Sequence, residues 1–440
     1  MKRLSKSLLF FTTMAFGLCL VTPSILMAAT PIWASAALAE LIEEGLIQNK
    51  ELQSLQAQVE SLEEEVSFAG SLEDPRLGFG ALNLPTDTFS FTQEPMTQKV
   101  LFIAQKIPWF GKLSLKSKRT TLMAVRQQAV LEAKKVELAR KIATAYYELG
   151  IVATSLDINE RLMNMVSQLL RVAETRYASG KGLQQDVLQA QVELSKVLDE
   201  KIVLRRQYRT LEDRINELLN RESFSPVTPP RDLTYQDPTL EFEVLKQQSL
   251  SENPWLGVRQ AEVDQASVDI ELAEKDYWPN MDIALAYGQR DEDLSGRDLP
   301  DFFSATVTLT IPLWQKSRQG PKLAATRKSH QAAVKSYRNL VESLPYRVDA
   351  LATEIRDIQE NYRLYVDALL VQSEQWARSS LAAYGVGKVE FNTTINAQIR
   401  LLRAELQAKR YLYSIYQKRA ELEEVLGGPI RVAAANRGAI

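Results

Sequence analysis

Two stretches of the chain alternate between apolar and polar positions. Met281, Ile283, Leu285 and Tyr287 fall on one face of an extended strand, and residues 303–311 place apolar side chains at every odd position and Ser or Thr at every even position. Because successive side chains of a strand point to opposite faces, this pattern predicts a hairpin over about 281–311 with one wholly apolar face. A weaker alternation at Leu77, Phe79 and Ala81, followed by strand-like residues 99–107, predicts another hairpin over about 76–107.

An apolar strand face can lie against lipid or against a soluble core, and both interpretations are open at this point. The absence of a predicted partner sheet favours lipid. Four strands cannot close a barrel, and open edges in hydrocarbon would leave backbone groups unpaired. Three copies of the chain would supply twelve strands, which predicts a trimeric 12-stranded barrel.

The rest of the pattern is helical. A first helix is predicted over 38–69, a long helix over about 111–177 and a return helix over about 183–220. The second half repeats this with a long helix over about 317–384, in which Pro345 is expected to cause a kink, and a return helix over about 391–426. Apolar residues of the first long helix recur at steps of three or four, namely Leu122, Val125, Ala129, Ala133, Val136, Ala139, Ala143, Tyr146 and Gly150. This spacing predicts antiparallel coiled-coil rods on the order of 100 Å long.

The chain contains an internal repeat. Asn49, Leu52, Gln56 and Pro75 recur 204 residues later as Asn253, Leu256, Gln260 and Pro279, and Tyr177, Gly180 and Lys181 recur 207 residues later as Tyr384, Gly387 and Lys388. Two collinear matches predict a tandem duplication, with units at 37–222 and 239–427. A proline-rich linker at 223–238 separates them, and a tail follows at 428–440.

The first 36 residues have the pattern of a secretory signal peptide. Lys2, Arg3 and Lys6 precede an apolar run, and Ala34-Ser35-Ala36 offers a cleavage site. An uncleaved anchor is the alternative. Phe16-Gly17-Leu18 before Cys19 is a poor signal for lipid attachment.

The composition excludes most kinds of catalytic and metal-binding site. Beyond residue 36 there is no cysteine and one histidine, His330, so thiolate sites and Cys/His pairs cannot form within one chain. We predict no catalytic, cofactor-binding or metal-binding residues, and hence no enzyme. The net charge of −2 argues against nucleic acid as a partner. A soluble periplasmic coiled-coil protein, structural or adaptor-like, is the main alternative to a membrane channel.

The residues around the two helical turns resemble the TolC, or outer-membrane efflux protein, family. The resemblance rests on residues 176–190 (RYASGKGLQQDVLQA) and 384–397 (YGVGKVEFNTTINA), and residues 105–112 (QKIPWFGK) are similar to members that serve heavy-metal resistance-nodulation-division pumps. It implies a homotrimer whose outer-membrane barrel continues into a periplasmic tunnel of twelve helices. It also implies a periplasmic adaptor (membrane fusion protein) and an inner-membrane pump as partners. Drugs, metal cations and, through a type I secretion duct, proteins remain open as cargo.

The resemblance also places a gate at the helical turns. Its gate Asp and Tyr match Asp186 and Tyr384, but its Arg position is Val389, and its two acidic ring positions are Thr393 and Asn396. We therefore expect a weaker closure, by a Tyr384–Asp186 hydrogen bond with Glu390 as the nearby carboxylate. Capping of the return helix is the alternative role of Asp186. The candidate gate residues are Tyr177, Asp186, Tyr384, Glu390, Thr393 and Asn396, and the candidate turn and adaptor-contact residues are Gly180, Lys181, Gly387 and Lys388.

Overall fold

The structure is a computed structural model that describes residues 35–231, 233–235 and 240–431. Nearly all of the predicted signal peptide, with Cys19, lies outside the described residues, as do most of the tail and part of the linker.

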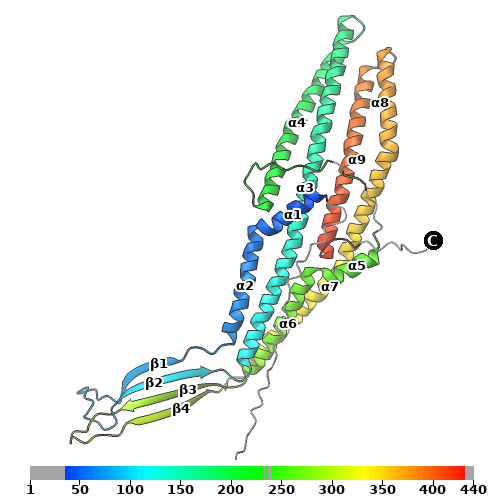
Figure 1. The fold of residues 1–440 in the computed structure, drawn as a ribbon. Helices are drawn as coiled ribbons and strands as arrows, with labels where there is room; N and C mark the ends of the chain where they lie inside the picture. The colour runs from blue at the N-terminus through cyan, green and yellow to red at the C-terminus, as the bar shows by residue number, and fades with distance from the viewer. Residues whose placement is uncertain (1–34, 232, 236–239, 432–440) are drawn as a thin grey trace, which may run out of the picture.

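The chain is mainly helical with one small antiparallel sheet, as the sequence predicts (Figure 1). The first half contains α1 (Ala36–Gln48), α2 (Lys50–Gly70), β1 (Arg76–Leu82), β2 (Gln98–Ile107), α3 (Lys112–Ala178) and α4 (Gln184–Leu219). The second half contains α5 (Phe242–Glu252), α6 (Pro254–Lys275), β3 (Asn280–Gln289), β4 (Phe302–Thr310), α7 (Gln319–Leu364), the π-helix η1 (Tyr365–Leu369), α8 (Leu370–Gly385) and α9 (Phe391–Leu426). Both halves thus run through two helices, two strands, a long helix and a return helix.

The helix expected over 38–69 is divided at Asn49. Its side chain accepts hydrogen bonds from the N–H groups of Glu51 and Leu52 and begins α2, and Asn253 begins α6 in the same way by accepting from the N–H of Trp255. The amide of Asn49 also donates to the Leu218 carbonyl (3.0 Å), and that of Asn253 donates to the Val425 carbonyl (2.8 Å). Each asparagine therefore ties the start of one helix to the end of its own return helix.

The second long helix is interrupted, but not at Pro345. α7 continues through that proline, and the helical hydrogen-bond pattern changes instead at η1, twenty residues further on. A single π-helical turn inside a helix is often found at functional positions.

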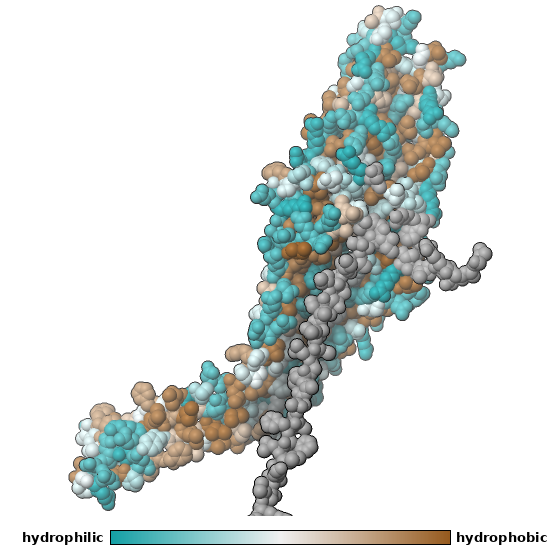
Figure 2. Space-filling model, in the orientation of Figure 1, coloured by the Kyte–Doolittle hydropathy of each residue, from teal (hydrophilic) through white to brown (hydrophobic). Residues whose placement is uncertain are grey.

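The four strands form one sheet in the order β1-β2-β3-β4. The middle pairing of β2 with β3 joins the two halves of the chain, and Leu101 lies opposite Tyr287 within it. β1 and β4 are the edges of the sheet. Figure 2 shows apolar residues over the middle of the sheet and hydrophilic residues at its far end.

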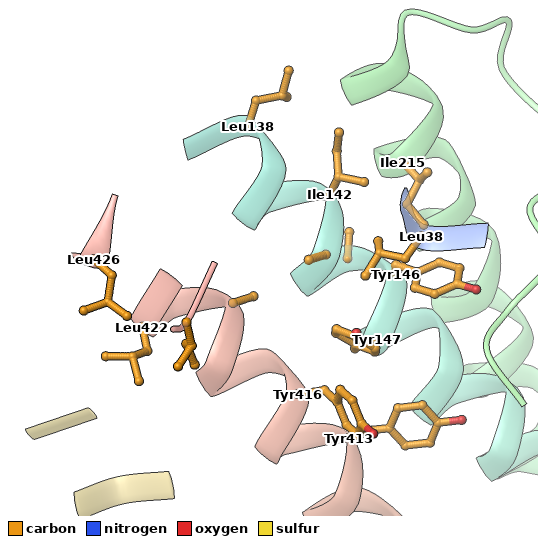
Figure 3. Packing of buried hydrophobic residues seen from close by; sticks show 14 of the residues in the cluster. Leu38, Leu138, Ile142, Tyr146, Tyr147, Ile215, Tyr413, Tyr416, Leu422 and Leu426 are labelled. Carbon is orange, nitrogen blue, oxygen red and sulfur yellow. The ribbon is translucent and has the colours of Figure 1, made fainter. Parts of the chain in front are cut away.

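The core runs along α3, which packs against α2, α4, α6 and α9. Ile142, Tyr146 and Tyr147 of α3 pack with Tyr413 and Tyr416 of α9 (Figure 3). A second buried cluster lies between this core and the two turns, and it joins α3, α4, α8 and α9.

The predicted seam of α3 is only partly correct. Ala133, Ala143, Tyr146 and Gly150 are buried, but Val125 is 52 % exposed. Leu131, Leu138 and Leu149, which lie outside the predicted seam, are buried as well. A central helix with neighbours on several sides buries more than one stripe, so one heptad period does not describe it.

Within the described part of the chain, no helix combines the length and the apolar character that crossing a membrane requires.

Candidate functional site at the two helical turns

The turns between α3 and α4 and between α8 and α9 have the same backbone geometry. The N–H of Lys181 donates to the Arg176 carbonyl (2.8 Å), and the N–H of Lys388 donates to the Ala383 carbonyl (2.9 Å). Gly180 and Gly387 have φ of +70° and +75°, a left-handed conformation that other residues adopt at a cost. The side chains of Lys181 and Lys388 are exposed beside these glycines. The two turns therefore present matching surfaces at the same end of the helices (Figure 1).

The tyrosines at the two turns differ in their surroundings. Tyr177 is 49 % exposed, whereas Tyr384 is 4 % exposed. The Tyr384 ring packs edge-on against Phe391 (5.7 Å between centroids), and the Arg176 guanidinium carbon lies 4.8 Å from the Tyr384 centroid. Arg176 also donates to the Tyr384 carbonyl (3.1 Å) and to the Lys181 carbonyl (3.3 Å). Arg176 thereby connects the two turns.

The expected Tyr384–Asp186 hydrogen bond is not formed within the chain. The Tyr384 hydroxyl is buried and has no hydrogen-bond partner among the described residues. Burial raises the pKa of Tyr384, the charge of Arg176 opposes that rise, and the charge of Asp186 adds to it. Asp186 is thus close enough to act electrostatically, but the tyrosine ring is held inward between Arg176 and Phe391 and its hydroxyl does not reach the carboxylate.

The two carboxylates at the turns lie at the starts of the return helices. Asp186 is in the first turn of α4, where the positive end of the helix dipole stabilises its negative charge. Its side chain makes no capping hydrogen bond, because the N-cap residue is Leu183. Glu390 occupies the N-cap position of α9 and is exposed, also without a capping hydrogen bond.

Thr393 and Asn396 are both exposed on the first turns of α9. The Asn396 amide donates to the Asn392 side chain (2.6 Å), which also accepts from Gln189 of α4 (2.9 Å). This polar network is a second connection between the two halves near the turns. It carries no charge.

Arg176 is the residue that sequence reasoning did not single out. Its counterpart 207 residues later is Ala383, so only the first turn has this guanidinium. The sequence contains one indication of its role: Arg176 is a charge present in only one of the two repeats, and it comes directly before Tyr177, whose counterpart in the second repeat is Tyr384.

The apolar sheet face is a second candidate site. Phe79, Leu101, Tyr287 and Phe303 form one row across the four strands, with exposed fractions of 90 %, 53 %, 50 % and 72 %. Leu77, Ile103 and Leu285 form the next row and are also exposed. A contiguous exposed apolar patch of this kind indicates contact with lipid or with another protein.

A family model described as "Outer membrane efflux protein" matches the chain twice, over residues 41–221 and 245–428. The chain belongs to this family. No curated protein sequence gives a significant match.

Several solved structures share the fold of this outer membrane efflux protein. The outer membrane protein VceC from Vibrio cholerae is 17 % identical, with a TM-score of 0.76, over 90 % of this chain and 97 % of that one. The outer-membrane channel OprN is 17 % identical, with a TM-score of 0.75, over 90 % of each chain. The MtrE outer membrane channel of Neisseria gonorrhoeae, solved in its open state, is 14 % identical, with a TM-score of 0.73, over 89 % of each chain.

No metal-binding cluster is evident in this outer membrane efflux protein. Among the residues that the structure describes, no three His, Cys, Asp or Glu side chains are grouped to hold a metal ion. His330 lies half-buried in α7.

Proposed function

We propose that the chain is one subunit of a homotrimeric channel in the bacterial outer membrane. The channel extends into the periplasm as the passive exit duct of a tripartite efflux system. A periplasmic adaptor and an inner-membrane pump would deliver the substrate and supply the energy. Family membership supports this role, and the exposed apolar sheet is the observation that carries it.

The sheet is incomplete in one chain. Its apolar rows are exposed, and the outer edges of β1 and β4 have no partner strand among the described residues. Exposed apolar area of this kind is stabilised in lipid, but unpaired edges are not. Pairing of β1 with β4 of the next subunit would close a barrel of twelve strands around a threefold axis.

The helices would continue this barrel into a periplasmic tunnel. We infer that the two halves of the chain, 37–222 and 239–427, are duplicated units. Each subunit would then contain two equivalent helix pairs. The matched contacts Asn49–Leu218 and Asn253–Val425 support that inference, since each residue is displaced by the repeat offset. Three subunits would then place six helix pairs around the tunnel.

The tip of the tunnel would act as the gate. Tyr177, Asp186, Tyr384, Glu390, Thr393 and Asn396 lie at or next to the two turns, and threefold symmetry would convert each residue that faces the axis into a ring of three. The adaptor would contact the exposed surface of the two turns, where its own backbone can approach the channel closely. This surface consists of Gly180, Lys181, Gly387 and Lys388.

The decisive experiment is cross-linking of the sheet edges. Cysteine placed at Ala81 of β1 is combined, one at a time, with cysteine at Ala305, Val307 or Leu309 of β4. The only native cysteine, Cys19, lies in the predicted signal peptide, so the background is clean. At least one pair is expected to give covalent trimers in outer-membrane fractions, and the Ala81→Cys single variant is the control.

The two alternatives predict different results. A soluble periplasmic coiled-coil protein would be monomeric in the soluble fraction and would form no trimers, which would refute the proposal. A type I secretion duct would form the same trimers, but loss of the gene would then block secretion of a protein and leave small-molecule efflux unchanged.

A further inference from the structure

One face of α9 carries the candidate ring positions of the tip and continues along the helix away from the turn. Thr393, Asn396, Arg400, Arg403, Gln407 and Arg410 follow one another at steps of three and four residues, which places them along one side of the helix. All are exposed except Gln407, which is half-buried. The side of α9 that carries the candidate ring positions at the tip therefore becomes arginine-rich further along the helix.

These arginines line a groove with a volume of about 560 Å³ between α4, η1 and α9. Glu200 of α4 and Tyr365 of the π-helical turn lie on its other walls. Glu200 is the only acid among the described residues that line it. Arg400 also stands 5.8 Å from the ring centroid of Trp376, so aromatic surface adjoins the positive charge.

Ion pairs among the described residues leave the positive charge of this groove unneutralised. Between described residues, no ion pair includes Arg400, Arg403 or Arg410. Glu405, the carboxylate of the same helical segment, is paired with Arg161 at 2.6 Å instead. An arginine side chain remains charged at any physiological pH.

We propose that this groove is an anion-selecting segment of the duct and that the exported substrates include small organic anions bearing a carboxylate or sulfonate. The inference rests on the proposed channel. Three arginines from each of three subunits would place nine guanidinium groups around the lumen against three copies of Glu200. Guanidinium groups bind carboxylates and other oxyanions through paired hydrogen bonds, and the neighbouring aromatic rings suit an apolar body on the same molecule.

The test compares ion selectivity in planar bilayers. Wild-type trimers are reconstituted, and the reversal potential is measured across a KCl gradient to give the ratio of chloride to potassium permeability. The ratio is expected to exceed one in the wild type and to fall below one when Arg400→Gln, Arg403→Gln and Arg410→Gln are combined. Lys409→Gln is the control and is compared with Arg400→Gln alone, because each removes one positive charge per subunit and Lys409 is exposed on the opposite side of the helix from Arg400.

A second measurement uses benzenesulfonate as the probe. It is expected to reduce the wild-type current, and the concentration for half block should rise roughly tenfold in the triple variant, the factor that a loss of about 1.4 kcal/mol produces. If the wild type prefers potassium, or if the wild type and the triple variant have equal permeability ratios, the proposal that the groove selects anions is refuted. The proposed channel would not be affected by that result. Wild-type trimers that do not conduct at all would overturn the proposed channel and the groove with it.

Discussion

Arg176 stacks on Tyr384 and hydrogen-bonds its backbone carbonyl across a separation of 208 residues in the chain. The pair joins the end of α3 to the end of α8, which are the two helices that lead to the turns. Neither contact uses the tyrosine hydroxyl. The connection between the two halves at the tip therefore depends on the guanidinium and on the ring.

Removing this guanidinium should loosen the tip. Arg176→Gln loses a charge-assisted hydrogen bond and a cation–π contact, which together are worth about 2–3 kcal/mol. We expect a larger mean single-channel conductance and greater sensitivity of cells to large antibiotics. Tyr384→Phe keeps the ring and should leave conductance unchanged, and Lys181→Gln controls for the loss of one positive charge at the turn.

The gate could be closed by the Arg176–Tyr384 contact or by a hydrogen bond of the Tyr384 hydroxyl to Asp186, and the same variants distinguish these two interpretations. If Tyr384→Phe and Asp186→Ala raise conductance while Arg176→Gln does not, the tyrosine hydroxyl acts on the Asp186 of a neighbouring subunit. The connection through Arg176 would then have no part in closure.

Gly427 should be much less tolerant of substitution than its neighbour. It ends α9 with φ of +86°, and a Cβ there would lie 2.2 Å from the Glu252 carbonyl oxygen. Gly427→Ala is expected to cost at least about 1–2 kcal/mol from backbone conformation alone, and more from the clash. Gly428→Ala adds a Cβ that has no described atom within 4 Å apart from its own chain neighbours, and should stay close to the wild type. Thermal unfolding followed by circular dichroism compares them, and equal midpoints would contradict the steric argument.

Glu423 should make stability depend on pH. Burial raises the pKa of its carboxyl to about 7, although the Ile430 N–H donates to it (3.3 Å) and the charge of Arg419 acts in the opposite direction. A carboxyl with a raised folded pKa binds its proton more tightly in the folded state, so stability falls as pH rises from about 4.5 to about 7. The decline is expected to reach about 1–3 kcal/mol. Glu423→Gln should remove this decline when unfolding midpoints are compared at both ends of the window, and an unchanged slope would exclude Glu423 as its source.

Asp276 should stabilise the junction between the helices and the sheet. It accepts hydrogen bonds from Lys112 (3.1 Å) and Lys322 (2.6 Å), and the Lys112 side chain is only 9 % exposed. Asp276→Asn leaves a nearly buried ammonium without its counter-charge and is expected to cost about 1–3 kcal/mol. The exposed Lys118–Glu271 pair is the control, and Glu271→Gln should change the free energy of unfolding by less than about 0.5 kcal/mol. Similar losses in both variants would show that burial of Lys112 is unimportant.

Local patterns were sufficient for most of the secondary structure. Alternation at 281–287 and 303–309 coincides with β3 and β4, because a strand has a period of two that nothing else imitates over such lengths. The long helix predicted over about 111–177 coincides with α3, and the glycines of the two turns have the left-handed backbone that their positions require. The helix breaks at Asn49 and Asn253 were visible only as repeated residues, since an asparagine in a helical pattern does not by itself reveal a cap.

The sequence by itself determined the helical and sheet content, the apolar sheet face and the family, because these depend on neighbouring residues and short motifs. The tertiary structure alone decided how the tip is assembled. It placed Arg176 over Tyr384, left the Tyr384 hydroxyl without a hydrogen bond to Asp186, and gave α3 several buried stripes instead of one. Contacts between residues some two hundred positions apart depend on how the helices pack, and no local periodicity encodes that packing.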